Sequence, residues 1–247
     1  MREKYGLIGY PLGHSFSRQY HNERFERENI AAVYDIYELP NISLLPELVT
    51  RETALRGLNV TIPYKQSVMT YLDAIDNVAQ RVGAVNVIKI ERDNNRVRMV
   101  GYNSDYMGFR NSLTPLLQPH HRHALVLGTG GASKAVCAAL HDLNIATTSV
   151  SRTPGEGKIS YEELSPEVME AHTLIVNATP LGMYPRVADC APIPYTHITP
   201  RHLCYDVVYN PQQTAFMQRC ALQGATVCNG LQMLYGQADA AWEIWKR

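Results

Sequence analysis

Short apolar, β-rich runs alternate with amphipathic stretches along the first hundred residues. The runs lie at residues 5–9, 32–39, 57–62 and 84–90, and helix-like segments separate the first three. A charged stretch at 18–29, with Tyr20, Phe25 and Ile30 as its apolar positions, is typical of a surface helix. This alternation predicts an α/β fold.

A second α/β unit begins after a connection rich in proline and histidine at residues 114–123. Its apolar runs are separated by stretches of helical length and lie at residues 124–127, 147–150, 173–177, 203–209 and 225–228. Runs this apolar indicate a parallel sheet that is covered on both faces. The sequence therefore predicts a doubly wound α/β unit in the second half of the chain.

Two further segments have recognisable patterns. Polar residues 91–96 separate two β-like runs, and Asp93, Asn94 and Asn95 among them predict a hairpin turn. Residues 231–247 place their apolar side chains at helical spacing and predict a terminal helix.

The composition is that of an ordinary globular protein and argues against several functions. Of the 247 residues, 45% are apolar and 19% are charged, which is enough to build a sizeable core. Lys plus Arg equals Asp plus Glu at 23 each, so no overall field favours nucleic acid or an anionic membrane as a partner. The first residues, MREKYGLIGYPLG, contain no long apolar run. We therefore expect no signal peptide or transmembrane start, and a cytoplasmic protein.

The five cysteines are odd in number and lack the CxxC or Cys/His spacing of a metal site. All but Cys190 lie among apolar neighbours in predicted helices or strands. Reduced, packed thiols are the simpler interpretation, and we expect no bound metal.

A glycine-rich loop follows the first strand of the second unit. In ALVLGTGGASKAV, Gly128, Gly130 and Gly131 come directly after a strand, and residues 132–140 are predicted as a helix. Without a Cβ, the backbone can turn sharply and approach a pyrophosphate that binds the first amides of the helix. Ala135 stands where the dinucleotide fingerprint has its last Gly or Ala. A plain turn is the alternative, but the strand before and the helix after favour dinucleotide binding.

The end of the next strand indicates which dinucleotide binds. NAD-binding proteins normally place Asp or Glu there to hold the ribose 2′-hydroxyl, whereas this chain has Ser151, Arg152 and Thr153. A guanidinium matches a 2′-phosphate, which a carboxylate would repel. We therefore predict NADP over NAD, the alternative being that Arg152 is only a solvated loop charge.

Polar residues also gather at loops and strand ends of the first unit. Ser15 and Ser17 alternate just before a predicted helix, so one of them could simply be its N-cap. Two hydroxyls beside the amides of a helix start could also bind a small carboxylate.

A second polar grouping lies in GLNVTIPYKQ. Asn59 and Thr61 alternate on a β-run and share one face, and Lys65 follows Pro63. Because proline suits the first turn of a helix, we expect Lys65 in that turn, where the helix dipole disfavours a cation. A local rule broken in this way hints at acid/base work. The alternative is a lysine that only reaches into water.

A third grouping places Asn86, Asn103 and Asp105 near chain reversals marked by glycines. Asn and Asp beside glycines usually form turns, so each residue alone gives little support for a function.

Together these motifs carry a resemblance. Eight of them occur in an order that resembles the shikimate dehydrogenase family over essentially the whole chain: GYPLGHSFS, NVTIPYK, GAVN, GYNSD, GTGGASKA, NATPLGM, YDVVYNP and NGLQMLYGQA. The resemblance implies two domains with the active site in the cleft between them. Residues 1–103 with 231–247 would form an α/β substrate domain, and residues 104–230 a Rossmann-type, doubly wound NADP-binding domain.

The resemblance also implies residue roles. Lys65 and Asp105 would be the catalytic pair, and Ser15 and Ser17 would hold the substrate carboxylate. The ring hydroxyls of shikimate or 3-dehydroshikimate would be bound by Thr61, Asn86 and Gln237, with Tyr209 nearby. NADP would contact Gly128, Gly130, Gly131, Ala132, Ser151, Arg152, Thr153, Asn177, Thr179, Met183 and Gly230.

The chain departs from the family pattern at several positions. Arg18 stands where the helix usually begins with proline, Ser104 replaces a more frequent threonine, and a second arginine after Arg152 is missing. Lys158 is a candidate for that missing charge. A dehydrogenase that also uses quinate or NAD, and a non-catalytic NADP-binding sensor, are therefore the alternatives. We expect a monomer or a homodimer, and the sequence leaves both open.

Overall fold

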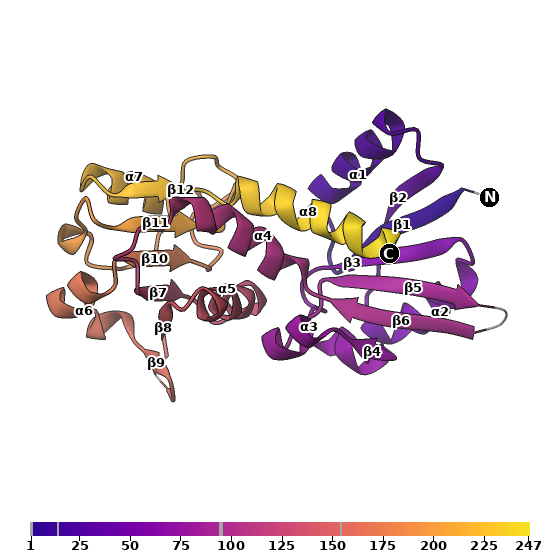
Figure 1. The fold of residues 1–247 in the computed structure, drawn as a ribbon, viewed down its shortest axis with the longest axis horizontal. Helices are drawn as coiled ribbons and strands as arrows, with labels where there is room; N and C mark the ends of the chain where they lie inside the picture. The colour runs from indigo at the N-terminus through magenta and orange to yellow at the C-terminus, as the bar shows by residue number, and fades with distance from the viewer. Residues whose placement is uncertain (1, 14, 94–95, 154) are drawn as a thin grey trace. The chain divides into compact units, whose positions relative to one another are not determined.

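The structure is a computed structural model of the 247-residue chain and describes residues 2–13, 15–93, 96–153 and 155–247. It divides into two compact units, one formed by Met1–Ser104 with Gln237–Arg247 and the other by Asp105–Gly236. The chain crosses between them inside α4 (Ser104–Leu113) and inside α8 (Leu231–Lys246), and each unit holds a six-stranded sheet (Figure 1). The assignment of the units to substrate and cofactor stays a prediction.

The sheet of the first unit is mixed, with strand order β2-β1-β3-β5-β6-β4. Its strands are β1 (Glu3–Gly9), β2 (Ala32–Glu38), β3 (Leu55–Val60), β4 (Ala74–Ile75), β5 (Val87–Asp93) and β6 (Arg96–Tyr102). β1 pairs in parallel with β2 and β3, whereas β5 runs antiparallel to β3 and to β6. The carboxyl ends of β1, β3 and β6 and the start of β5 therefore lie at one edge of the sheet.

The first half of this unit is built from βαβ connections. α1 (Phe16–Arg27) joins β1 to β2, and the 3-10 helix η1 (Ile42–Leu44) with α2 (Leu45–Arg51) joins β2 to β3. β2 and β3 lie on opposite sides of β1, so the sheet has a topological switch point between β1 and β3. Small ligands of open α/β sheets bind at such a point, outside the carboxyl ends of the strands.

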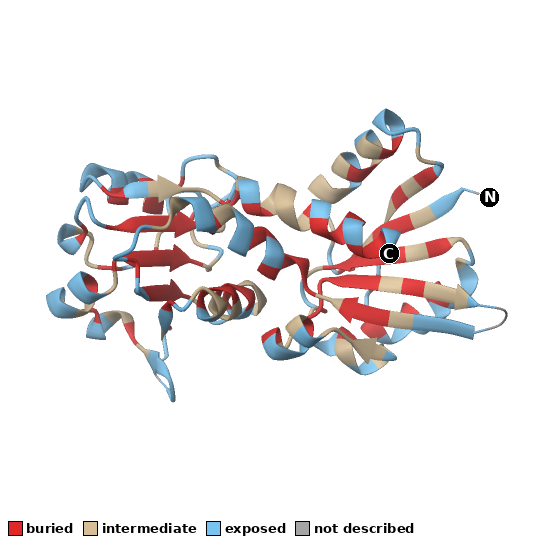
Figure 2. Ribbon diagram, viewed as in Figure 1, coloured by how far each residue is buried: buried red, intermediate tan, exposed pale blue. Residues whose placement is uncertain are grey.

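Alternate strand residues of this unit enter two different apolar clusters. One contains Ile8 and Ile88 and is covered by α2, and the other contains Tyr5 and Val87 and is covered by α1 and α8. Successive side chains of a strand point to opposite faces, so the two clusters lie on opposite faces of the sheet. Figure 2 shows buried residues along the strands of both units. Trp245 fixes α8 in place, since its Nε1 donates to the Ile88 carbonyl at 3.1 Å.

The structure tests two local predictions in this unit. The hairpin is confirmed by the antiparallel register of β5 and β6, which pairs Asp93 with Arg96, while Asn94 and Asn95 lie outside the described residues.

The helix predicted after Pro63 is wrong. Residues 62–63 and 65–66 form turns, and the 3-10 helix η2 (Ser67–Tyr71) begins only after Gln66. The Thr61 carbonyl accepts from the Tyr64 amide at 2.9 Å and closes the turn around Pro63. Proline suits a turn as well as a first helical turn. The helix-dipole argument for Lys65 therefore does not apply.

The sheet of the second unit is parallel throughout, with strand order β12-β11-β10-β7-β8-β9. Its strands are β7 (His123–Leu127), β8 (Ala146–Val150), β9 (Lys158–Ile159), β10 (Leu174–Asn177), β11 (Leu203–Asp206) and β12 (Thr226–Cys228). The chain enters at β7, adds β8 and β9 on one side, and then adds β10 to β12 on the other. This is the doubly wound Rossmann order, and its switch point lies between β7 and β10. The predicted parallel sheet is confirmed.

The apolar run at residues 203–209 forms a strand only as far as Asp206. The Asp206 Oδ1 accepts from the Val208 amide at 3.0 Å, and its Oδ2 accepts from the Thr214 hydroxyl at 2.6 Å. These bonds turn the chain at the end of β11. The prediction of strand for 207–209 is therefore wrong, because apolar character alone does not show that a carboxylate closes a strand.

Further helices cover the sheets or connect their strands. They are α3 (Asn77–Val82), α5 (Gly131–Asp142), α6 (Pro166–Ala171) and α7 (Ala215–Leu222), with the 3-10 helices η3 (Thr114–Leu116), η4 (Tyr161–Glu163) and η5 (Tyr195–His197). Asp76, Ser165 and Thr214 cap α3, α6 and α7 by accepting from a backbone amide of the first turn. Within the described ranges, none of the helices combines the length and apolar character needed to span a bilayer.

The packing of α8 on β3 can be tested at Gly57. A Cβ added there would collide with the Trp245 ring, so we expect Gly57→Ala to lower the free energy of unfolding by about 1–3 kcal/mol through overpacking. Urea unfolding followed by tryptophan fluorescence measures this loss. Gly13→Ala is the control, since a Cβ at Gly13 would meet no atom within 4 Å. Equal stability of the two variants would contradict the packing described.

Candidate active site

The polar residues of the first unit gather at the edge formed by the ends of β1, β3 and β6. Ser15 precedes α1, Thr61 follows β3, Asn86 precedes β5, and Asn103 follows β6. The backbone joins these segments, since the Thr61 amide donates to Ile8 and the Asn86 amide donates to Tyr102. The edge of the sheet that runs from the switch point at β1 and β3 to β6 thus carries these side chains.

The two serines at the start of α1 have different surroundings. Ser15 is the N-cap, and its hydroxyl accepts from the Arg18 amide at 3.4 Å. Ser17 lies close to the phenol of Tyr34 on β2. The N-cap interpretation therefore holds for Ser15 and not for Ser17.

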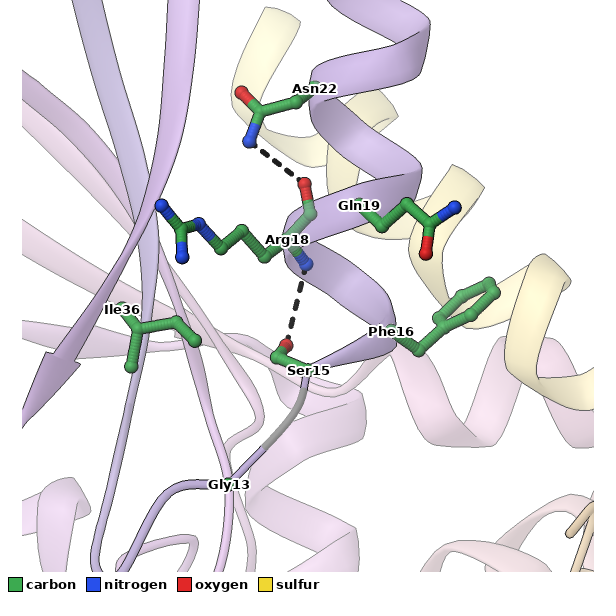
Figure 3. Close-up of a pocket in the computed structure, with 7 residues that line it drawn as sticks. All are labelled: Gly13, Ser15, Phe16, Arg18, Gln19, Asn22 and Ile36. Atoms are coloured by element: carbon green, nitrogen blue, oxygen red, sulfur yellow. Dashed lines mark hydrogen bonds between the residues drawn. The ribbon is translucent and has the colours of Figure 1, made fainter.

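A cavity of about 660 Å³ opens beside Ser15, between α1 and β2. Figure 3 shows Arg18 extending from α1 toward Ile36 across this cavity. The hydroxyl of Ser15 and the guanidinium of Arg18 therefore line one open cavity, where a cation and a hydroxyl could meet an anionic group.

A chain of buried polar side chains runs behind this edge. The Tyr34 hydroxyl donates to Asn59 Oδ1 at 2.8 Å, and Asn59 Nδ2 donates to the Asn86 carbonyl at 3.3 Å. Burial raises the pKa of Tyr34, so the phenol stays protonated and donates. The sequence did not predict a role for Tyr34. Its only signal was a polar atom within an apolar β-run.

The amide of Asn86 is held by Ser104, which also reaches α8. Asn86 Oδ1 accepts from the Ser104 amide at 2.7 Å, and Asn86 Nδ2 donates to the Ser104 hydroxyl at 3.1 Å. The Ser104 hydroxyl also donates to Gln237 Oε1 at 3.5 Å. The structure therefore brings together Asn86 and Gln237, two predicted substrate-binding residues 151 positions apart (237 − 86). Ser104, noted only as a departure from the family pattern, links them.

Lys65 lies on the turn after β3, where its carbonyl accepts from the Val85 amide at 2.7 Å. That bond places the turn beside the segment that carries Asn86. Lys65 belongs to the first unit, whereas Asp105 is the first residue of the second. Their pairing therefore stays a prediction.

His21 supports Tyr34 from within α1. Its ring is fully buried and stacks on the Tyr34 ring, with centroids 4.8 Å apart and planes at 16°. Among the described residues, neither ring nitrogen has a hydrogen-bond partner. Burial lowers the pKa of His21 to about 3, so the imidazole is neutral at physiological pH and serves as a packing surface.

In the second unit, the glycine-rich loop lies at the switch point between β7 and β10. Gly128 has φ of +100°, and a Cβ added there would lie 2.9 Å from Thr179 Cγ2 on the loop after β10. α5 begins after Gly130, which makes no side-chain cap, and a Cβ at Gly130 would meet no atom within 4 Å. The first amides of α5 are thus open to a pyrophosphate, and the loop fits a dinucleotide.

The predicted 2′-phosphate residues follow β8, next to the glycine-rich loop in the sheet order. Ser151 is anchored by its amide, which donates to the Ile159 carbonyl at 2.9 Å, while Arg152 and Thr153 are exposed. Lys158 is also exposed and begins β9, which pairs with β8. Ser151, Arg152 and Thr153 therefore stand directly after β8, where the acidic residue of an NAD-binding protein would lie, and Arg152 is the cation among them.

The loop after β10 is fixed by its own side chains. Asn177 is buried, and its Oδ1 accepts from the Thr179 amide at 3.2 Å and from the Thr179 hydroxyl at 2.6 Å. Met183, farther along the loop, leaves 48% of its surface exposed, and Tyr209 after β11 leaves 40%. Position 230 requires glycine, since a Cβ there would collide with the Val207 carbonyl.

Comparison with known proteins identifies the family. A profile described as "Shikimate dehydrogenase substrate binding domain" matches residues 7–88. A Clostridium beijerinckii protein named shikimate dehydrogenase (NADP(+)) is 39% identical over 99% of this chain and 92% of its own length. The chain belongs to the shikimate dehydrogenase family.

Solved structures of shikimate dehydrogenases share the whole fold. The Thermus thermophilus shikimate 5-dehydrogenase in complex with NADP(H) and shikimate has a TM-score of 0.85 at 30% identity, covering 98% of this chain and 93% of that one. The Listeria monocytogenes shikimate 5-dehydrogenase in complex with shikimate and NAD has a TM-score of 0.87 at 27% identity, covering 99% and 91%. The two-unit α/β architecture expected from the resemblance is thereby confirmed.

The burial of His21 predicts a specific acid sensitivity. Its pKa is about 3 when folded against an ordinary 6.5, so below pH 6.5 the unfolded chain binds a proton that the folded chain excludes. The free energy of unfolding is therefore unaffected by His21 above pH 6.5 and decreases as the pH falls below that value. The loss amounts to about 1.4 kcal/mol per pH unit between about pH 6 and pH 4.

His21→Phe keeps the ring packing and should remove this dependence. Urea unfolding at several pH values compares the two proteins, and it is followed by the fluorescence of Trp242 and of Trp245, whose ring centroid lies 5.3 Å from that of His21. Parallel pH dependences of wild type and His21→Phe would show that His21 is not the acid-sensitive group.

Proposed function

We propose that this protein is an NADP-dependent shikimate dehydrogenase. It reduces 3-dehydroshikimate reversibly to shikimate with NADPH, a step of the shikimate pathway toward chorismate and aromatic amino acids. The observation that carries the proposal is the combination of family membership over 99% of the chain with polar side chains gathered at the switch point of each sheet. A cytoplasmic location and a monomeric or homodimeric state stay predictions.

Substrate binding is assigned to the first unit, with one contribution from the second. Ser15 and Ser17 bind the carboxylate, and Thr61, Asn86 and Gln237 bind the ring hydroxyls. The bonds from Ser104 to the amide of Asn86 support this assignment, because they fix the amide before a ligand arrives. Tyr209, in the second unit, is the sixth residue assigned to the substrate.

Cofactor binding is assigned to the second unit. Gly128, Gly130, Gly131 and Ala132 cradle the pyrophosphate at the start of α5. The remaining contacts are made by residues after β8, β10 and β12, namely Ser151, Arg152, Thr153, Asn177, Thr179, Met183 and Gly230. When bound, NADPH supplies the hydride, so these residues hold its nicotinamide in reach of the substrate carbon.

Lys65 and Asp105 are assigned to proton transfer. As the carbonyl carbon gains hydride, negative charge develops on its oxygen, and the Lys65 ammonium stabilises that charge and donates the proton. Asp105 orients the amine. The position of Lys65 on a turn at the end of β3, beside the Asn86 segment, supports the assignment.

Replacement of the lysine tests this role. We expect Lys65→Ala to lower kcat by a factor on the order of 100 or more, with a much smaller change in KM for shikimate, because the lost interaction forms mainly in the transition state. Lys89→Ala, which removes a lysine paired with Glu91 on β5, is the matched control and should leave kcat unchanged. An unaltered kcat in Lys65→Ala would remove Lys65 from the mechanism.

Replacement of Arg152 tests the cofactor assignment. We expect Arg152→Ala to raise KM for NADPH by a factor of about 10 and to change KM for NADH little, because only NADPH carries the 2′-phosphate. Arg110→Ala, at an exposed position of α4, is the control. If KM for NADPH does not change, Arg152 does not bind the 2′-phosphate.

A second candidate is a dehydrogenase that also accepts quinate or NAD. It is favoured by the single arginine after β8, where the resemblance implies two. Initial rates with shikimate and quinate, each paired with NADP and NAD, are read from the nicotinamide absorbance at about 340 nm. A clear preference for shikimate with NADP supports the proposal, and comparable rates with the other pairs support the second candidate. A protein that binds NADPH without any turnover would instead be a sensor.

A further inference from the structure

A carboxylate without a charged partner is buried at the end of β11. Asp206 has 0% exposure, and none of the ion pairs found among the described residues includes it. Its oxygens accept from Asn177 Nδ2 at 2.9 Å, from the Val208 amide at 3.0 Å and from the Thr214 hydroxyl at 2.6 Å. Burial raises the pKa of this group to about 6. Because these donors are all neutral, the buried carboxylate depends on all three hydrogen bonds to offset the cost of its burial.

The accepting oxygens of Asp206 fix the direction of the neighbouring amide. An ionised carboxylate can only accept hydrogen bonds, so Asn177 must turn its Nδ2 toward Asp206 and its Oδ1 away from it. Oδ1 then accepts from both the amide and the hydroxyl of Thr179. The Thr179 hydroxyl in turn accepts from the Leu181 amide at 3.3 Å. The orientation set by Asp206 is thus passed along the loop after β10.

The same carboxylate also fixes the loop after β11. Val208 and Thr214 lie on either side of this loop, and both donate to Asp206. The two loops are joined as well, since the Tyr184 amide donates to the Asn210 carbonyl at 3.2 Å. One buried group therefore holds two loops that leave neighbouring parallel strands at their carboxyl ends.

We propose that Asp206 is a positioning residue for the cofactor: acting through Asn177, it holds the loop of Thr179 and Met183 in the geometry that receives the nicotinamide. The proposal rests on the assignment of this loop to NADPH made above. Asp206 itself touches neither cofactor nor substrate. The same carboxylate also holds the loop that carries Tyr209. The loop assigned to the cofactor and the loop of Tyr209 are therefore both fixed by Asp206.

Two variants of Asp206 test whether its hydrogen bonds to the loops matter, or only the space that its side chain fills. Asp206→Leu keeps the number and branching of the side-chain heavy atoms but leaves the donors of Asn177, Val208 and Thr214 unpaired. Asp206→Asn keeps an acceptor for Asn177 and Val208, and its amide can donate to the Thr214 hydroxyl. We expect Asp206→Leu to raise KM and Kd for NADPH on the order of tenfold, and Asp206→Asn to stay within about threefold of wild type.

His202→Leu is the matched control for lost stability. His202 is also buried and hydrogen-bonded, to Thr199 and to the Met169 carbonyl, but it precedes β11 and so lies at the opposite end of that strand. We expect it to lower the melting temperature as Asp206→Leu does while leaving KM for NADPH near the wild-type value. Equal effects of the two variants on KM and Kd would overturn the proposal. If Asp206→Asn is as impaired as Asp206→Leu, the hydrogen-bond account is also overturned.

A double-mutant cycle tests the route through Asn177. If Asp206 acts through Asn177, the combined Asp206→Leu/Asn177→Ala protein should bind NADPH no more weakly than Asn177→Ala alone. Additive losses would contradict the route. Should Asp206→Leu fail to fold, Asp206→Ser, which leaves room for a water in place of the carboxylate, takes its position in the cycle.

Hydrogen exchange separates this proposal from the proposed function. In the ligand-free protein, amides of residues 178–184 should exchange faster in Asp206→Leu than in wild type or His202→Leu. Unchanged exchange overturns the positioning role whatever the enzyme catalyses. A wild type that neither binds NADPH nor reduces 3-dehydroshikimate overturns the proposed function, while faster exchange in Asp206→Leu would still show that Asp206 holds the loop.

Discussion

The two sheets place their chemistry by the same constraint. In a parallel α/β sheet, every strand ends at one edge, and the following helix begins there with unpaired amides. Where the strand order reverses, two of these strand ends diverge and leave room for a ligand. In the first unit this point lies between β1 and β3, and in the second between β7 and β10. Predicted site residues that directly follow these strands therefore lie at the same edge of their sheet.

Buried polar side chains then fix the groups at those edges. Tyr34, Asn59, Asn86, Ser104 and Gln237 form one hydrogen-bonded series in the first unit. In the second unit Asp206, Asn177 and Thr179 form another. Each series joins residues assigned to a ligand with others that only hold them, and the members satisfy one another's donors and acceptors. Such support lets a site meet its ligand without reorganising, which is where much of the catalytic advantage of an enzyme arises.

The sequence predicted the architecture because periodicity and glycines report backbone geometry. The strands around the hairpin, the parallel second sheet and the loop at Gly128 follow from local patterns, and the structure agrees with them. The turn at Lys65 was missed because proline suits turns and helix starts equally. The end of β11 was missed because its cause is the side chain of Asp206, whose partner Thr214 is eight residues farther along.

The candidate site was predicted less evenly than the fold. Lys65 was singled out because a cation is unusual in a first helical turn, Ser15 because two hydroxyls precede a predicted helix, and the glycines because they stand between a strand and a helix. Tyr34 escaped notice, since its role depends on an amide 25 residues away in the chain. Long-range partners of this kind become visible only when the strands are paired. Some site residues, such as Gln237, were predicted only from the family resemblance, because no local sequence pattern indicates them.

The central claim is that this chain transfers a hydride from NADPH to the carbonyl carbon of 3-dehydroshikimate. The most direct measurement uses NADPH deuterated at the transferring position of the nicotinamide, with the product analysed by NMR. The account predicts shikimate with one deuterium at the ring carbon that bears the new hydroxyl. Recovery of unreacted 3-dehydroshikimate, or of a product without deuterium at that carbon, would contradict it.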